Sequence, residues 1–304
     1  MHRYLLFFLL TFFIFGAPDA HAIRVVTSFS ILGDMVKQIG GTKVDQTVLV
    51  GPDKDAHTYE PTPADIRALS EADLLIINGL KFEGWMGRLI ESSSYKGPVI
   101  IASKGVRALK ISKAGDTHRG ADDGKGEYDP HAWQSLANGI VYANNICDAL
   151  VNADKANAPI YKANARLFIK EMSDLEKRVK MQIKLLPEYK RRVITSHDAF
   201  QYYGKTYLIQ FIAPVGISTE AEPSAADVAK LIDQIREQNI KALFLENISR
   251  PGVLDQLKQE GAEIGGVLYS DALSTPEGPA GSYLNMFRQN TSLLLAAMQK
   301  NPDK

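Results

Sequence analysis

The sequence predicts an α/β protein of two Rossmann-like lobes, each built on a parallel sheet, with one long rigid helix between them. Three observations support this fold class. Short apolar segments of strand length alternate with stretches of helical periodicity, the same order of segments occurs twice, and one uninterrupted helical pattern separates the two copies. Continuous apolar strands, without alternating polar residues, are typical of parallel sheets covered by helices on both faces.

The first 22 residues have the features of a secretory signal peptide. Met1 to Arg3 is a short positive start, residues 4–15 are apolar, and Ala20-His21-Ala22 matches the small-residue cleavage pattern. The apolar run is shorter than the roughly 20 residues that a helix needs to cross a bilayer. No cysteine follows it. We therefore expect a cleaved protein without a lipid anchor, free in a Gram-negative periplasm.

The first lobe is expected to cover residues 23–154. Its helix after Glu60-Pro61 begins with Thr62 as the N-cap, and Asp65 is placed to reach back to the cap. Its predicted buried strands are residues 25–28, 74–78 and 99–102. Each strand leads into a helical stretch, as in a doubly wound sheet.

The second lobe, residues 187–304, repeats this order. Val193-Ile194-Thr195-Ser196 recurs 168 positions after Val25-Val26-Thr27-Ser28, and residues 222–231 repeat the capping motif of residues 60–69. Its predicted strands are residues 193–196, 242–247 and 266–269. The repeat indicates two lobes of the same topology.

The linking segment, residues 155–186, is predicted to be helical from 160 to 186. Apolar residues recur in it at steps of three and four, with Pro159 before the start and Pro187 after the end. At 1.5 Å per residue the helix would be roughly 40 Å long. A packed helix of that length would restrict the lobes to small rotations, so the cleft between them would be a pre-formed site.

Composition excludes several functions. Thirty-five basic residues balance 35 acidic ones, so the chain has no overall positive charge for binding nucleic acid. The one cysteine, Cys147, cannot form an intramolecular disulfide and lies on the apolar stripe of a predicted helix, which favours a packing role.

Four side chains follow predicted strands at the edge where a doubly wound sheet binds its ligands. They are His57, His131, His197 and Asp271. Three neutral imidazoles and a carboxylate are a suitable ligand set for a divalent transition metal. Asp271 could instead be a helix N-cap. Asp129 is interpreted as a turn residue beside Pro130, and His118 as part of a solvated loop.

Catalytic motifs are missing. The sequence contains no His-Glu-x-x-His run, no Gly-x-Ser-x-Gly elbow and no Walker loop. A zinc hydrolase would need an open coordination position and a base such as Glu60. Four protein ligands instead favour holding the metal, so we expect no enzyme, with a periplasmic zinc hydrolase or a receptor for a small organic ligand as alternatives.

Five motifs carry a family resemblance over the whole mature chain. They are Asp55-Ala56-His57-Thr58-Tyr59-Glu60-Pro61, Asn78-Gly79-Leu80 with Gly84-Trp85, Asp129-Pro130-His131-Ala132-Trp133, Thr195-Ser196-His197-Asp198, and Tyr269-Ser270-Asp271-Ala272-Leu273. The chain resembles the periplasmic solute-binding proteins of zinc and manganese ABC transporters. The resemblance implies that His57, His131, His197 and Asp271 bind the transported ion.

The resemblance also implies partners and a metal. It implies a monomeric receptor that delivers Zn(II) to an inner-membrane permease driven by a cytoplasmic ATPase. Family members with a His at the third ligand position bind zinc, or zinc and manganese, so His197 favours zinc, and His197→Glu is expected to shift preference toward manganese. The loop at residues 114–128 is short and has one His, and a second-lobe disulfide is impossible; both features keep Mn(II), or dual binding, as the alternative.

Overall fold

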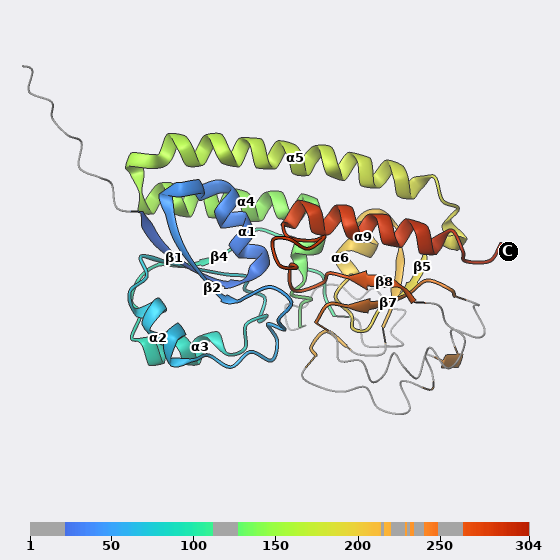
Figure 1. Ribbon diagram of the computed structural model, residues 1–304, viewed down its shortest axis with the longest axis horizontal. Helices are drawn as coiled ribbons and strands as arrows, with labels where there is room; N and C mark the ends of the chain where they lie inside the picture. Colours follow the sequence, from blue (N-terminus) through green and yellow to red (C-terminus); the bar gives the residue numbers. More distant parts are fainter. Residues whose placement is uncertain are drawn as a thin grey trace, which may run out of the picture.

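The chain folds into two sheets covered by helices (Figure 1). The computed structural model describes residues 22–111, 127–213, 216–219, 229, 232–233, 240–248 and 264–303. Its first-lobe elements are β1 (Ile23–Phe29), α1 (Ser30–Gly40), η1 (Gly41–Lys43), β2 (Val44–Val50), α2 (Pro63–Ser70), β3 (Leu74–Ile77), α3 (Met86–Ser93) and β4 (Val99–Ile101). The short helix η2 (Ala132–Gln134) then leads into α4 (Leu136–Ala153).

The second half of the chain repeats the pattern. After η3 (Lys155–Asn157) and α5 (Ala158–Lys184) come η4 (Glu188–Lys190), β5 (Arg192–Ile194), α6 (Gln201–Tyr207), β6 (Gln210–Ile212), β7 (Leu243–Glu246), β8 (Ile264–Leu268) and α9 (Tyr283–Met298). The strand orders are β2-β1-β3-β4 and β6-β5-β7-β8, and every pairing is parallel. The predicted fold class, two α/β lobes with parallel sheets, is confirmed.

The predicted helix start in the first lobe is also confirmed. The Thr62 side chain accepts a hydrogen bond from the Asp65 backbone N–H, and the Asp65 carboxylate accepts from the Thr62 backbone N–H, which completes a capping box. The second copy of this motif, in residues 222–231, lies outside the described residues apart from residue 229. The predicted strands differ from the observed ones by at most two residues at either end.

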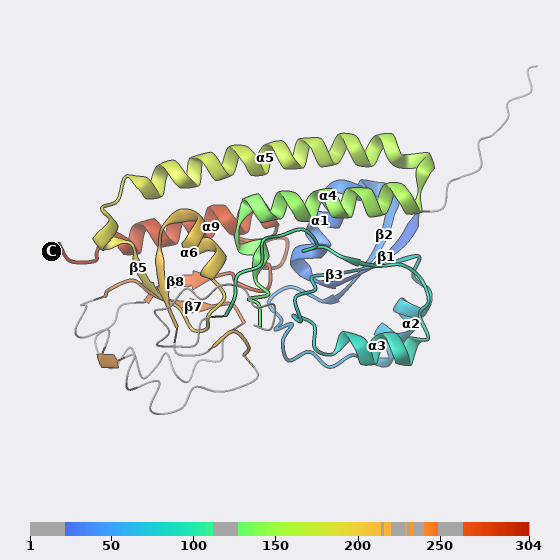
Figure 2. The same ribbon diagram turned by 180° about the vertical axis from the view of Figure 1, so that it is seen from behind.

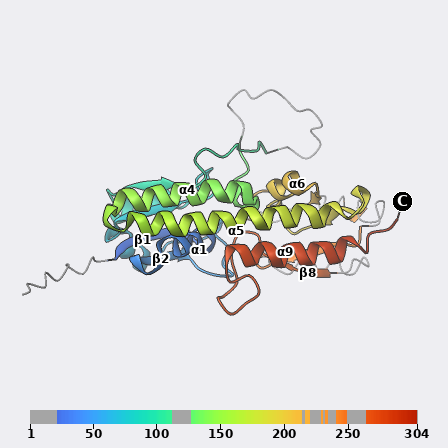
Figure 3. The same cartoon turned by 90° about the horizontal axis from the view of Figure 1, so that it is seen from above.

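Helix α5 spans both lobes, as its periodicity predicts. It packs on α1 and α4 of the first lobe and on α6 and α9 of the second (Figures 1 and 2). From above, α4, α5 and α9 lie side by side (Figure 3). The buried stripe of α5 consists of Tyr161, Ala165, Phe168, Met172, Leu175, Val179 and Ile183. Because one continuous apolar core includes this stripe and side chains of both lobes, large rotations between the lobes would expose apolar surface.

The structure describes the N-terminal segment only from residue 22 onward. Residues 1–21 are not described, so the structure does not test the predicted signal peptide, and the same holds for His118. Within the described ranges no helix has the length and apolar character that crossing a bilayer requires. Cys147 is buried on α4 and packs in the core, as expected.

Candidate metal centre

The four predicted ligands meet at one point between the sheets. His57 lies in the loop after β2, His131 directly precedes η2, His197 follows β5, and Asp271 follows β8. One candidate ligand atom from each residue lies within 4.8 Å of all the others. His57 is 8% exposed, His197 is 2% exposed, and the other two are fully buried. The topology therefore collects side chains that are separated by more than two hundred positions.

The distances between donor atoms suit a single ion. The Nε2 atoms of His57 and His131 are 3.3 Å apart. Asp271 Oδ2 lies 3.1 Å from His57 Nε2 and 3.2 Å from His197 Nε2, and its Oδ1 lies 3.5 Å from His131 Nε2. A tetrahedron with metal–ligand bonds of about 2.0–2.1 Å has edges of about 3.3–3.4 Å. These four distances between donor atoms are therefore close to the edges of such a tetrahedron.

Asp271 is the clearest sign that a cation belongs here. Neither of its carboxylate oxygens has a well-formed hydrogen bond from any described residue, and both face the three imidazoles. A fully buried carboxylate that lacks such donors is costly unless a positive charge compensates it. The alternative role of Asp271 as a helix N-cap does not apply, since α9 begins later, with Ser282 as its cap.

Asp129 holds His131 in place. Its Oδ1 lies 2.8 Å from His131 Nδ1 and also accepts the His131 backbone N–H at 2.9 Å. Asp129 is thus the predicted turn residue, because its side chain accepts the N–H two residues on, and it also contacts the imidazole of His131, which the turn interpretation did not include. Because Nδ1 faces a carboxylate, its proton stays there and the Nε2 lone pair is free for a metal. Asp129 and His131 are two residues apart, so Asp-x-His spacing was the available signal.

Glu246 holds His197 in place, as Asp129 holds His131. The sequence did not indicate Glu246 as part of the site. It ends β7, is 3% exposed, and its Oε2 lies 2.6 Å from His197 Nδ1. Its Oε1 accepts the His197 backbone N–H at 2.9 Å and the Ser196 hydroxyl at 2.7 Å. An acid at the end of the apolar strand Leu243–Glu246 was the available signal, because such an acid requires a partner.

His57 is held by its backbone and by aromatic rings. Its N–H donates to Asp55 Oδ1 at 2.8 Å, and its ring meets Phe82 edge-on at a centroid distance of 4.8 Å. The Trp85 indole N–H donates to the Ala56 carbonyl at 2.8 Å and ties down the same loop. His57 is thus the most exposed of the four candidate ligands, and its position depends on a loop.

The buried charges change the protonation of the site. Burial alone would lower the pKa of His131, but the negative charges of Asp271 and Asp129 outweigh it and raise the pKa to about 9. The pKa of His197 is likewise raised, against burial, by Glu246 and Asp271. Burial would raise the pKa of Asp271, yet His131 and His197 hold it well below its usual range. Without metal, protons on these imidazoles balance the acids.

The two lobes are joined differently on the two sides of the site. On the His131 side the contacts are buried: the Trp133 and Gln134 side chains both donate to the Ser270 carbonyl, at 2.9 and 2.7 Å, and the Tyr202 hydroxyl donates to the Asp129 carbonyl. On the His57 side the contact between the lobes is only partly buried. There the Thr219 hydroxyl donates to Asp55 Oδ2 at 2.6 Å.

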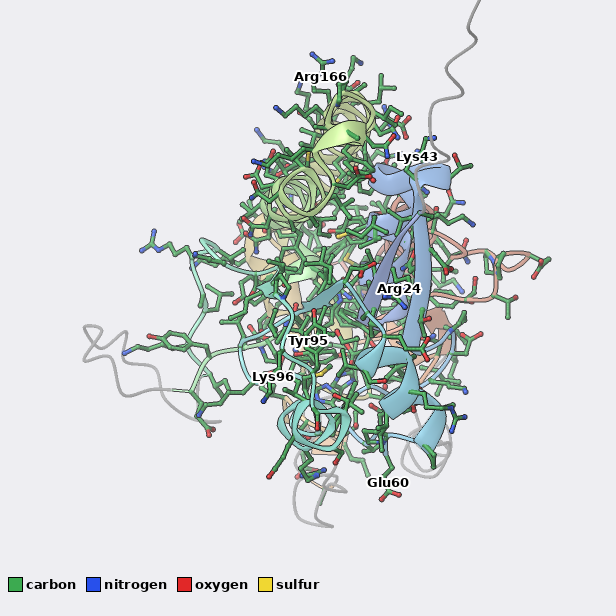
Figure 4. All side chains as sticks on the ribbon, turned by 90° about the vertical axis from the view of Figure 1, so that its left-hand side faces the viewer. Arg24, Lys43, Glu60, Tyr95, Lys96 and Arg166 are labelled. Atoms are coloured by element: carbon green, nitrogen blue, oxygen red, sulfur yellow. The ribbon has the colours of Figure 1, made fainter. Side chains whose placement is uncertain are left out.

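Glu60, the base that a hydrolase was expected to use, lies away from the centre. Its side chain is exposed and points outward from the surface (Figure 4). Ser28, near the end of β1, donates its hydroxyl to Glu83 Oε1 at 2.7 Å.

Comparison with known proteins identifies the family. The family model ZnuA, described as the periplasmic zinc-uptake complex component A, matches residues 25–297. The chain belongs to this family. It is a metal-binding substrate-binding protein of an ABC transporter, and the resemblance inferred from the motifs is confirmed.

Relatives of this ZnuA-family chain are named for different metals. The manganese-binding lipoprotein MntA of Halalkalibacterium halodurans is 30% identical over 285 residues, which cover 93% of this chain and 91% of that protein. The periplasmic zinc-binding protein TroA of Treponema pallidum has a TM-score of 0.82 at 26% identity, over 91% of this chain and 99% of that one. A Mn-bound mutant of the periplasmic metal-binding protein of Candidatus Liberibacter asiaticus has a TM-score of 0.80 at 31% identity, with the same coverage.

One expectation is overturned by these names. MntA and several other matched relatives are named lipoproteins, which are held at a membrane by covalently attached lipid. The expected free periplasmic protein without a lipid anchor is contradicted by this finding. That expectation depended on a cysteine missing after the apolar run, in a segment outside the described residues.

Proposed function

We propose that this ZnuA-family protein binds one Zn(II) ion through His57, His131, His197 and Asp271 and passes it to an ABC-type import permease. The observation that carries the proposal is the buried Asp271 carboxylate, whose oxygens face three imidazole nitrogens and lack any other donor among the described residues. A divalent cation would compensate this carboxylate and accept the three lone pairs.

Zinc is the first choice because three of the four ligands are imidazoles. Nitrogen ligands favour later and softer divalent ions, whereas oxygen-rich sites suit manganese. Two of these imidazoles also face carboxylates through Nδ1, which increases their basicity. Manganese, alone or together with zinc, is the second candidate, and the manganese-binding name of MntA favours it.

The proposed role is that of a carrier. Four protein ligands leave no position for an activated water, so the chain is proposed to catalyse nothing. It would act as a monomer that meets a permease driven by a cytoplasmic ATPase. Its proposed units are residues 1–22 as a signal peptide, 23–154 and 187–304 as the lobes, and 155–186 as the linking helix.

The test is a competitive calorimetric titration of the chelator-stripped protein with Zn(II) and then Mn(II). Binding of one zinc that manganese cannot displace would support the zinc receptor. Similar affinities would favour the dual receptor. Binding of neither ion would overturn the proposal. The matched control is Asp271→Asn, which keeps the shape of the side chain but removes its charge and is expected to bind neither ion tightly.

A further inference from the structure

We propose that Gln134 is a positioning residue for the candidate ligand Asp271, which it holds in place across the interface between the lobes. The inference rests on the proposed function and goes beyond it, because it assigns a role to a side chain outside the set of four ligands. Gln134 acts through the backbone next to Asp271. We therefore expect it to raise the affinity of the site for its ion through Asp271 alone.

Two first-lobe side chains hold the peptide bond that leads into Asp271. The Ser270 carbonyl accepts from Gln134 Nε2 at 2.7 Å and from Trp133 Nε1 at 2.9 Å. All four residues are fully buried, so water does not compete for these hydrogen bonds. Because the peptide bond is planar, a fixed carbonyl oxygen also fixes the peptide group that contains the Asp271 nitrogen. Only rotations within Asp271 itself then remain to place its carboxylate.

Gln134 lies on the same short helix as the segment that carries a second candidate ligand. His131 directly precedes η2, and Gln134 is the last residue of η2, whereas Asp271 follows β8 of the second lobe. The hydrogen bond from Gln134 therefore links two candidate ligands that come from different lobes. The loop beyond Asp271 is also held by the first lobe, since the Leu273 N–H donates to Ser30 Oγ at 3.0 Å. Asp271 is thus positioned by the first lobe as well as by its own strand.

The other half of the Gln134 amide makes this role testable. Its Oε1 is buried and has no hydrogen-bond partner among the described residues. An unpaired buried acceptor destabilises the folded state. Methionine is a flexible apolar side chain of similar length, so Gln134→Met removes the unpaired acceptor together with the donor. The loss of the donor should weaken metal binding, whereas the metal-free protein should keep its Tm. A glutamine with a purely structural role would instead lower both together.

Asn145 provides a matched control. Its Nδ2, on α4, donates to the carbonyls of Ala102 and Lys104 at 2.8 Å each, so this amide also holds a loop that follows a strand. Both partners belong to the first lobe, and neither lies next to a candidate ligand in the sequence. Asn145→Leu should therefore lower the Tm and leave the zinc affinity unchanged.

The experiment is a pair of double-mutant cycles, with Zn(II) affinity measured by chelator competition. Circular dichroism and Tm show that each variant folds. Gln134→Met is combined with Asp271→Ala in one cycle and with His57→Ala in the other. We expect Gln134→Met alone to weaken zinc binding about tenfold, the lower end of the range for groups that position a metal ligand. With Asp271→Ala the same change should have no further effect, whereas with His57→Ala the tenfold loss should persist.

Three results would count against the inference, and they are distinguishable. If the unmodified chain binds zinc and Gln134→Met binds it equally well, the positioning role is overturned and the proposed function stands. A tenfold loss that persists with Asp271→Ala would overturn the role as well, because Gln134 would then act on the whole fold. If the unmodified chain binds neither Zn(II) nor Mn(II), the proposed function fails, and this inference fails with it.

Discussion

The affinity for metal should keep rising with pH at values well above those at which an ordinary histidine loses its proton. The range of interest is pH 6 to 9. Divalent ions compete with protons for imidazole nitrogens, so affinity increases wherever a ligand is protonated in the metal-free site. From the sequence alone, with a histidine pKa of about 6.5, affinity would fall only near and below that pH. The structure moves this range upward, because the pKa of His131 is raised to about 9.

The magnitude follows from this pKa. At pH 7, a group with a pKa about two units higher is protonated roughly 100 to 1, which corresponds to about 1.36 kcal/mol per unit. The pKa of His197 is raised as well, by Glu246 and Asp271 against burial. Metal binding at neutral pH should therefore release about two protons, and the association constant should rise by up to about 100-fold per pH unit below pH 9.

The assay is calorimetry of zinc binding at pH 7 in two buffers of different ionisation enthalpy, which gives the number of released protons. Chelator competition at several pH values, corrected for the titration of the chelator itself, gives the affinity. Asp129→Asn is the control, since loss of its charge should lower the pKa of His131 and reduce the release. Release of fewer than one proton, together with constant affinity from pH 7.5 to 9, would show that His131 and His197 are not protonated in the metal-free site at neutral pH.

Three further outcomes are expected. Asp129→Asn should weaken zinc binding about 10- to 100-fold at pH 9 in chelator competition, because His131 loses its orienting partner; an unchanged affinity would contradict this. Thr219→Val removes the hydrogen bond to Asp55, on the loop that carries His57. Metal release into excess chelator, followed by stopped flow, should become roughly 2- to 10-fold faster, because a hydrogen bond contributes about 0.5–1.5 kcal/mol. An equal rate would show that this hydrogen bond between the lobes does not slow release. The Tm of the metal-free protein should fall between pH 6.5 and 9, because the stabilisation from the raised pKa of His131 is complete below the unfolded value and is lost as pH rises through 9; a rising Tm would be inconsistent with it.

The sequence predicts the fold and the four candidate ligands because both depend on local patterns. Apolar strands mark the sheets, and residues in the loops beyond the carboxyl ends of parallel strands lie at one edge of the sheet. The long stripe from Tyr161 to Ile183 predicts α5 with the same length and an offset of two residues. These features need no knowledge of which side chains touch across the lobes.

The partners of the ligands are harder to predict, because they depend on contacts between distant segments. Glu246 reaches His197 across 49 positions, and Trp133 reaches the Ser270 carbonyl across 137. No periodicity indicates either pair. Asp129 lies only two residues before His131, so this pair is closer in sequence. An Asp before a Pro is equally well explained by a turn, and only the position of its carboxylate shows that it also contacts the imidazole.

The duplication explains why the second lobe supplies a ligand directly after its first strand and the first lobe does not. Each lobe buries a carboxylate that accepts a hydrogen bond from the serine hydroxyl near the end of this strand, Glu83 from Ser28 and Glu246 from Ser196. The next residue is Phe29 in one lobe and His197 in the other. Phe29 packs against Phe82 and Trp133, which also line the imidazoles of His57 and His131 with apolar rings. The two candidate ligands of the first lobe therefore lie in loops, whereas in the second lobe the buried carboxylate that accepts from Ser196 also contacts the imidazole of His197. The same kind of buried acid can thus be purely structural in one lobe and also orient a candidate metal ligand in the other.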